Sequence, residues 1–179
     1  MGGGKEGRSQ TTEAARNHLW LGENPRLVQA MTPDRIDYLA ELAEESGSTA
    51  IEGRLAAAFV RQRGEYYLDL KFQKRVGPGK TLPPGSDPGI ARMAYHATRR
   101  RVDVVGYTPA GVILIEVKDE ITWSALVQLI DYRDLWLIAP GTPPPVGLMV
   151  VGRTIDAGIT ERAADLGIQV VLLPDLASV

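Results

Sequence analysis

The feature that most constrains the fold is the stretch RVDVVGYTPAGVILIEVK, which runs from Arg101 to Lys118. Two apolar runs are separated by a Pro/Gly turn, and this pattern predicts a β-hairpin. Each run carries an acid where a strand would otherwise stay apolar, Asp103 in the first and Glu116 in the second. Because side chains repeat every two residues along a strand, Glu116 and Lys118 face the same way. We therefore expect a hairpin that begins as core and ends in charged groups.

If Asp103 lies on the strand beside Glu116, two carboxylates and the Lys118 ammonium group meet at one place. Carboxylate oxygens are the ligands that Mg²⁺ prefers in proteins, and Mn²⁺ can substitute for it. A lysine beside a metal-bound water can position and stabilise the attacking hydroxide. The alternative is an exposed strand end with two charged residues and an unrelated aspartate nearby.

The pattern D-x12-E-x-K, formed by Asp103, Glu116 and Lys118, resembles the signature of the PD-(D/E)XK nuclease superfamily. One departure is that no proline precedes Asp103. The resemblance implies that Asp103 and Glu116 bind Mg²⁺ with help from the backbone carbonyl of Val117, and that Lys118 orients the attacking water. It also implies an α/β fold of the restriction-endonuclease-like type, with an αβββαβ core in which helices flank a mixed central sheet.

A helix is expected after the hairpin, over residues 122–137, with Thr122 as its N-cap. Gln128 and Tyr132 are four residues apart and so share one face of this helix. Q-h-x-x-Y at this place resembles the motif of the RecB-type exonuclease branch, which implies that both side chains flank the metal site and contact DNA. The alternative is an ordinary amphipathic helix with a polar side. Its buried stripe is expected to comprise Leu126, Leu129, Ile130 and Leu137.

An earlier helix is expected over residues 49–63, with a buried stripe that includes Leu55 and Phe59. Superfamily members open their core with such a helix, and Glu52 matches their site-facing glutamate. The sequence around Glu52 also resembles the start of archaeal Holliday-junction resolvases. The alternative is a capping box, in which Thr49 and Glu52 close the helix N-terminus. Gly53 is costly inside a helix, so we expect another backbone or the substrate to approach closely there.

The remaining elements follow from apolar runs between turn signals. Strands are expected near 65–74, 101–107, 111–118 and 146–152, with a last strand at IQVVLLP and a short helix over 156–166. A Pro/Gly-rich loop separates the first two strands. Its GPGKT segment looks like part of a phosphate-binding loop but lacks the first half of that motif. We expect residues 48–179 to form the nuclease-like domain.

Charge is unevenly distributed although the formal net charge is only −2. Arg99, Arg100 and Arg101 directly precede the strand of Asp103. Since a nuclease must hold phosphates beside its own carboxylates, these arginines are candidate DNA contacts. The alternative is a solvated strand start.

Composition excludes several other chemistries. The chain of 179 residues contains no cysteine and two histidines, which rules out thiolate sites and argues against a zinc site or a Ser-His triad. We find no apolar run long enough to span a membrane and no signal-like N-terminus, so we expect a cytoplasmic protein, or a virion-associated one if it is phage-encoded.

Residues 1–47 are expected to form a flexible segment followed by a short helix that starts at Thr32-Pro33. The apolar group of Leu19, Trp20 and Leu21 could dock on the core, on a second copy or on an assembly partner. The function expected from these features is Mg²⁺-dependent hydrolysis of DNA, by an exonuclease, a nicking enzyme or a junction-cutting dimer. The alternative is a DNA-associated structural protein, such as a phage head-completion or head-to-tail component, that retains the fold.

Overall fold

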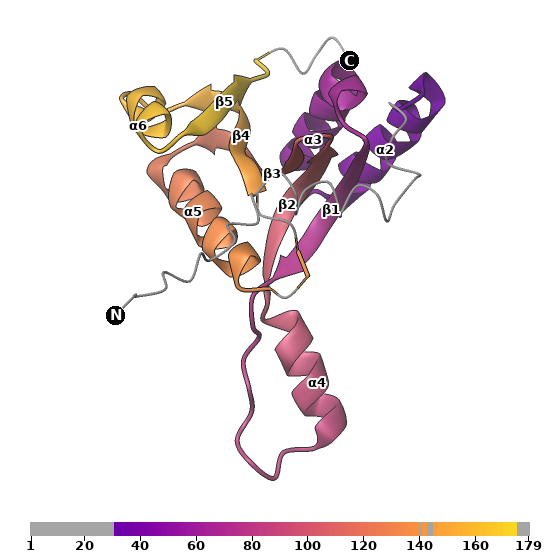
Figure 1. The fold of residues 1–179 in the computed structure, drawn as a ribbon, viewed down its shortest axis with the longest axis vertical. Helices are drawn as coiled ribbons and strands as arrows, with labels where there is room; N and C mark the ends of the chain where they lie inside the picture. Colours follow the sequence, from indigo (N-terminus) through magenta and orange to yellow (C-terminus); the bar gives the residue numbers. More distant parts are fainter. Residues whose placement is uncertain (1–30, 140, 143–144, 175–179) are drawn as a thin grey trace, which may run out of the picture.

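The computed structural model describes residues 31–139, 141–142 and 145–174 (Figure 1). In chain order, its elements are α2 (Pro33–Ser46), α3 (Ala50–Arg63), a 3-10 turn (Gly64–Tyr66), β1 (Asp69–Val76), α4 (Pro88–Ala97), β2 (Arg100–Thr108), β3 (Gly111–Ile121), α5 (Trp123–Leu137), β4 (Pro145–Ile155), α6 (Ile159–Asp165) and β5 (Ile168–Leu172).

The five strands form one mixed sheet in the order β1-β2-β3-β4-β5. The first three strands are antiparallel neighbours, whereas β3, β4 and β5 are parallel because α5 and α6 return the chain across the sheet. Helices α2 and α3 pack on one face and α5 and α6 on the other, with a separate apolar core under each pair (Figure 1). The expected α/β class and the αβββαβ order of the core are confirmed, and the architecture is compatible with a restriction-endonuclease-like fold.

Helix α3 is buried nearly all round because it lies between α2 and the sheet. The Thr49 hydroxyl accepts a hydrogen bond from the Glu52 amide at 3.2 Å and so caps the helix. A Cβ at Gly53 would collide with the backbone carbonyl of Glu44 in α2, so the expected close approach at this glycine is to another helix. The α2 residues Leu39, Ala40 and Ala43 belong to the same core as α3.

Four boundaries differ from the expectation by three residues or more, and one of them is the end of β4, at Ile155 rather than residue 152. Strand β1 begins at Asp69 rather than near residue 65, because a 3-10 turn follows α3. Strand β3 continues to Ile121, where its side chain is fully buried under α5. Helix α6 begins only at Ile159, after Gly158 turns the chain with a φ of 76°.

The expected buried stripe of α5 was wrong at Leu137. Leu126 and Leu129 are buried, but Leu137 is 55% exposed and Trp136 takes the buried place. Tyr132 is one turn before Trp136, so the buried face of the helix passes through these two aromatic residues. The face that carries Tyr132 is thus part of the core rather than a separate polar side.

Helix α4 was not expected from the sequence. It forms because Asp87 caps it through hydrogen bonds from the amides of Gly89 and Ile90, with Pro88 in the first turn. The Asp-Pro pair was the signal that could have predicted it. Together with the loop before it, α4 projects from the ends of β1 and β2 as an arm, and none of the residues of α4 is buried (Figure 1).

Within the described ranges, no helix is both long and apolar enough to cross a membrane. The apolar group of Leu19, Trp20 and Leu21 lies outside the described residues.

Candidate functional site

Asp103 lies where the hydrogen-bonding ladders on both sides of β2 are interrupted. The β2–β3 ladder runs from Thr108↔Gly111 to Val104↔Ile115 and stops there, one residue before Asp103. The backbone N–H of Val117 donates instead to the Asp103 carboxylate, with N to Oδ2 at 3.0 Å. Because β2 no longer pairs with β3 at this point, the Asp103 side chain accepts the hydrogen bond of the Val117 amide in place of a β2 carbonyl. This hydrogen bond holds the carboxylate beside β3.

Three carboxylates gather around the ammonium group of Lys118. Its Nζ lies 2.7 Å from Glu116 Oε1, 3.5 Å from Glu52 Oε1 and 3.9 Å from Asp103 Oδ2. These residues come from β3, α3 and β2, so elements far apart in sequence build one cluster. The structure thus brings together Asp103, Glu116, Lys118 and Glu52, the four charged residues that the sequence analysis placed at the site.

Glu116 is the most deeply buried member of this cluster, with its side chain 2% exposed, whereas Lys118 is 26% exposed. Burial and the neighbouring Asp103 charge raise the pKa of Glu116 to about 8, although Lys118 opposes the shift. Burial lowers the pKa of Lys118, but the charge and hydrogen bond of Glu116 outweigh it, so the net shift is upward. Lys118 therefore stays charged at neutral pH, while Glu116 readily holds a proton.

Glu52 does not complete a capping box through its side chain. Thr49 caps α3 with its hydroxyl, but the Glu52 carboxylate points to Lys118 and not back to the helix terminus. Thr49 therefore caps the helix and Glu52 belongs to the charged cluster, while a catalytic role for Glu52 stays a prediction.

Tyr132 and Gln128 approach the cluster from α5. The pKa of Tyr132 is raised by burial and then by the negative charges of Glu116 and Asp103, and a hydrogen bond with Glu116 places its phenol beside that carboxylate. Gln128 lies one turn earlier on the same helix face. Its Oε1 atom is buried and has no hydrogen-bond partner within the described residues. Tyr132 therefore lies beside the site although it is buried among apolar neighbours, and Gln128 shares its helix face and stays a predicted site residue.

Gln73 is a member of the site that the sequence analysis missed. It lies directly opposite Asp103 in the register of β1 and β2, at the point where that ladder skips one pair. Its Nε2 donates to Asp103 Oδ1 at 3.2 Å, and its φ of 50° is the only positive value of a non-glycine residue within the described ranges. A strained, left-handed residue is often maintained by function. No local pattern signals it, because the contact spans 30 residues.

The oxygen atoms of the charged cluster can be compared with those that a divalent cation requires. Glu116 Oε2 is buried and lacks a hydrogen-bond partner in the described part of the chain, so it is available as a ligand. Within the same part, no three acidic, histidine or cysteine side chains are arranged to hold a metal together. Two carboxylates and one carbonyl fit Mg²⁺, which keeps several waters and takes few protein ligands. These residue types are ones that Mg²⁺ accepts, and Asp103, Glu116 and the Val117 carbonyl stay the predicted donors.

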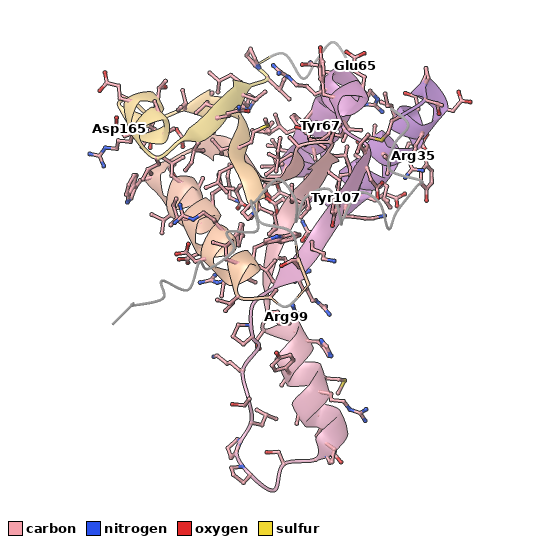
Figure 2. All side chains as sticks on the ribbon, viewed as in Figure 1. Arg35, Glu65, Tyr67, Arg99, Tyr107 and Asp165 are labelled. Atoms are coloured by element: carbon pink, nitrogen blue, oxygen red, sulfur yellow. The ribbon has the colours of Figure 1, made fainter. Side chains whose placement is uncertain are left out.

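The arginine tract is divided among different surroundings. Arg99, at the base of the arm in Figure 2, donates from Nε to Gly77 O at 2.7 Å and from Nη2 to Arg75 O at 3.1 Å. Arg100 is exposed, and its charge lowers the pKa of Tyr132, which places it on the α5 side of the site. Arg101 is exposed and lies opposite Arg75. Arg100 and Arg101 are thus exposed near the start of β2, whereas Arg99 bonds backbone carbonyls at the base of the arm.

No protein-family model matches the chain, and no curated protein sequence matches it. Among solved structures, a repair endonuclease from Pyrococcus abyssi shares 15% identity at a TM-score of 0.35, covering 97% of this chain and 49% of that one. A protein from Vibrio cholerae shares 16% identity at a TM-score of 0.41, covering 92% of this chain and 47% of the other. The chain spans about half the length of both structures. Similarity this distant says nothing about activity, which has to be inferred from the side chains themselves.

Proposed function

We propose that the protein is a metal-dependent nuclease of the PD-(D/E)XK type that hydrolyses phosphodiester bonds in DNA. One observation carries the proposal: Glu52, Asp103 and Glu116, from three different elements, surround the Lys118 ammonium group within 3.9 Å. A structural salt bridge needs one partner for a lysine. Three carboxylates around one lysine, with a nearly buried Glu116 among them, cost desolvation and mutual repulsion. Such an arrangement is more typical of functional sites than of stabilising ones.

Asp103 and Glu116 would hold Mg²⁺, with the Val117 carbonyl as a third protein ligand and Mn²⁺ as a substitute. When bound, the cation would act as a Lewis acid on the phosphate and lower the pKa of the attacking water. This role is supported by the hydrogen bonds that the Val117 amide and the Gln73 side chain donate to the two oxygens of Asp103. Fixed ligands of this kind need little rearrangement when the cation arrives.

Lys118 would orient the attacking water and stabilise the charge that develops on the scissile phosphate. Its ammonium group is partly exposed and carries three donors, so it can contact water and phosphate while it remains near Glu116. Glu52 would keep the ammonium on the open side of the site. Tyr132 and Gln128 would contact the substrate strand from α5, and Arg100 and Arg101 would contact flanking phosphates.

The test is incubation of the full chain with linear, circular, single-stranded and branched DNA in Mg²⁺, Mn²⁺ or EDTA. We expect cleavage in both metals, none in EDTA, and none by Asp103→Asn. A matched control is Asp119→Asn, which removes a carboxylate of β3 that pairs on the surface with Arg153, outside the cluster. Cleavage that persists in EDTA, or equal loss in both variants, would contradict the proposal.

The alternative is a DNA-associated structural or assembly protein that keeps the fold without cleaving. Lys118 already occupies Glu116 Oε1 at 2.7 Å, and no third acidic ligand joins the two carboxylates in a metal-binding arrangement within the described residues. This alternative predicts a stable oligomer or a partner complex by light scattering, with no cleavage of any DNA form in either metal.

A further inference from the structure

A cationic groove runs along β1 and β2 beside the charged cluster, and we call it the β1–β2 groove. Five of its lining residues are cationic: Lys71, Lys74, Arg75, Arg99 and Arg101. Figure 2 labels Arg99 where the arm begins and Tyr107 farther along the sheet, and both line the groove. The groove therefore extends from the base of α4 along the antiparallel half of the sheet.

The positions of two cations in the groove lower the stability of the sheet. Arg75 and Arg101 are register partners on adjacent antiparallel strands, and like charges directly opposite each other destabilise a sheet. Lys71 is paired with Asp69 at 2.9 Å, but no ion pair within the described ranges includes Lys74, Arg75 or Arg101. Three exposed, unneutralised cations in one groove therefore point to an anionic ligand.

The groove is connected to the charged cluster through Gln73. This residue lines the groove, and its side-chain amide contacts Asp103 at 3.2 Å. Arg101 lies two residues before Asp103 on β2. A phosphate chain in the groove would consequently lead to the carboxylates without crossing another element.

The aromatic residues of the groove favour an unpaired strand over a duplex. Phe72 and Tyr107 line it beside the cations, and both are partly exposed, although Phe72 also packs against the core under α2 and α3 and Tyr107 against the core under α5 and α6. Proteins that bind single strands combine a basic groove with aromatic rings on which bases stack, whereas a duplex keeps its bases out of reach. We propose that the β1–β2 groove holds a single-stranded stretch of DNA that adjoins the scissile phosphate, an inference that rests on the nuclease function proposed above.

The experiment measures binding of the full chain to fluorescently labelled oligonucleotides by anisotropy in EDTA, where no cleavage is expected. The DNA forms are a single strand, a blunt duplex of the same length, and that duplex with a single-stranded tail. The test variant is Arg75→Ser with Arg101→Ser. The control is Arg54→Ser with Arg61→Ser, which removes two exposed arginines of α3 that do not line the groove.

We expect the wild type to bind the single strand and the tailed duplex more tightly than the blunt duplex. The test variant should lose about tenfold or more in affinity for the single strand, and its slope of log affinity against log salt should fall by about 1.4 for two lost phosphate contacts. The control should stay within about twofold. Because the variant removes a repulsive cross-strand pair, its melting temperature should stay the same or rise.

A second variant, Tyr107→Leu, tests the stacking while keeping an apolar side chain in the sheet. Its affinity for the single strand should fall by about fivefold or more, with little change for the blunt duplex. Equal affinity of the wild type for single strand and blunt duplex would overturn the assignment, as would equal losses in test and control variants. The binding result can be separated from cleavage. If the wild type binds the single strand as expected but hydrolyses no DNA, the groove assignment stands and the nuclease proposal is overturned. If the wild type hydrolyses DNA but the test variant binds the single strand as tightly as the wild type, the nuclease proposal stands and the groove assignment is overturned.

Discussion

The side-chain amide of Gln73 donates to Asp103 Oδ1 at 3.2 Å while its own backbone holds a φ of 50°. The two residues face each other across β1 and β2 at the pair that the ladder omits. A left-handed conformation costs a residue with a side chain about 1 kcal/mol or more relative to glycine. The strain is thus located at the residue that orients a candidate metal ligand.

Two substitutions at Gln73 separate orientation from strain. Gln73→Ala and Gln73→Gly both remove the donor to Asp103, so both should lower the rate of DNA cleavage by about tenfold. Glycine also relieves the positive φ, so the glycine variant should be about 1 kcal/mol more stable than the alanine variant. Initial rates and urea unfolding test this. Equal activity in the wild type and both variants would remove Gln73 from the site.

Lys118→Met should abolish turnover without loss of metal binding. Methionine keeps the length of the side chain but removes the ammonium group that lies among the three carboxylates. Because that group competes for Glu116, Mn²⁺ affinity measured by calorimetry should stay the same or rise. A rate above about a tenth of the wild-type value would correspond to less than about 1.4 kcal/mol of transition-state stabilisation and would contradict a catalytic role.

Glu52 and Thr49 can be separated although they share one helical turn. Thr49→Ala should lower the free energy of unfolding by about 1 kcal/mol, because the hydroxyl caps α3, and should leave cleavage unchanged. Glu52→Gln should lower the cleavage rate by about tenfold with little change in stability, because its carboxylate faces Lys118 and not the helix end. The reverse pattern would assign Glu52 to capping.

Tyr132→Phe removes only the hydroxyl beside the carboxylates. The ring remains packed in the core, so the melting temperature should change little, whereas the rate on DNA ends should fall by about tenfold. Gln128→Ala should lower the rate to a similar extent, because it removes the proposed contact with the substrate strand. Its stability should change little, because the buried Oε1 has no hydrogen-bond partner within the described residues that the substitution would leave unpaired. Wild-type rates in both variants would remove α5 from the site.

The raised pKa of Glu116 predicts a pH dependence of stability in the absence of metal. Its pKa rises from 4.5 to about 8 on folding, so between these values the folded protein holds a proton that the unfolded chain has released. Protonation of Glu116 therefore contributes to the free energy of unfolding. This contribution is fully present below about pH 4.5 and is lost as pH rises through about 8. Glu116→Gln has no carboxyl group to titrate, so it should lack this pH dependence. The melting temperature of the variant minus that of the wild type, both measured in EDTA, should therefore increase from pH 5 to pH 9.

Added Mn²⁺ should reverse that trend in the wild type. A bound cation favours the ionised carboxylate, so the increase in melting temperature caused by Mn²⁺ should be larger at pH 8 than at pH 5. Glu116→Gln should show little increase at either pH. An equal effect of Mn²⁺ on the wild type and the variant would place the cation elsewhere.

The sequence by itself determined the local elements and their charged ends. Alternation along residues 101–118 placed Glu116 and Lys118 on one side of a strand, and helical spacing placed Gln128 and Tyr132 on one face, because both periodicities act over a few residues. The same reasoning left Glu52 open between two roles. It missed α4, whose Asp-Pro start was readable, and it misplaced Leu137, because which side of a helix is buried depends on its neighbours.

Only the tertiary structure decided how the site is assembled. The contact of Glu52 with Lys118, the seat of Asp103 on the Val117 amide and the donor from Gln73 join α3, β1, β2 and β3. These contacts depend on where the pairing of β2 with its neighbours stops. Two strands stop pairing where sheet twist and packing separate them, and no local sequence pattern predicts that point. The division of Arg99, Arg100 and Arg101 among three surroundings has the same origin, since register and the base of the arm fix where each guanidinium lies.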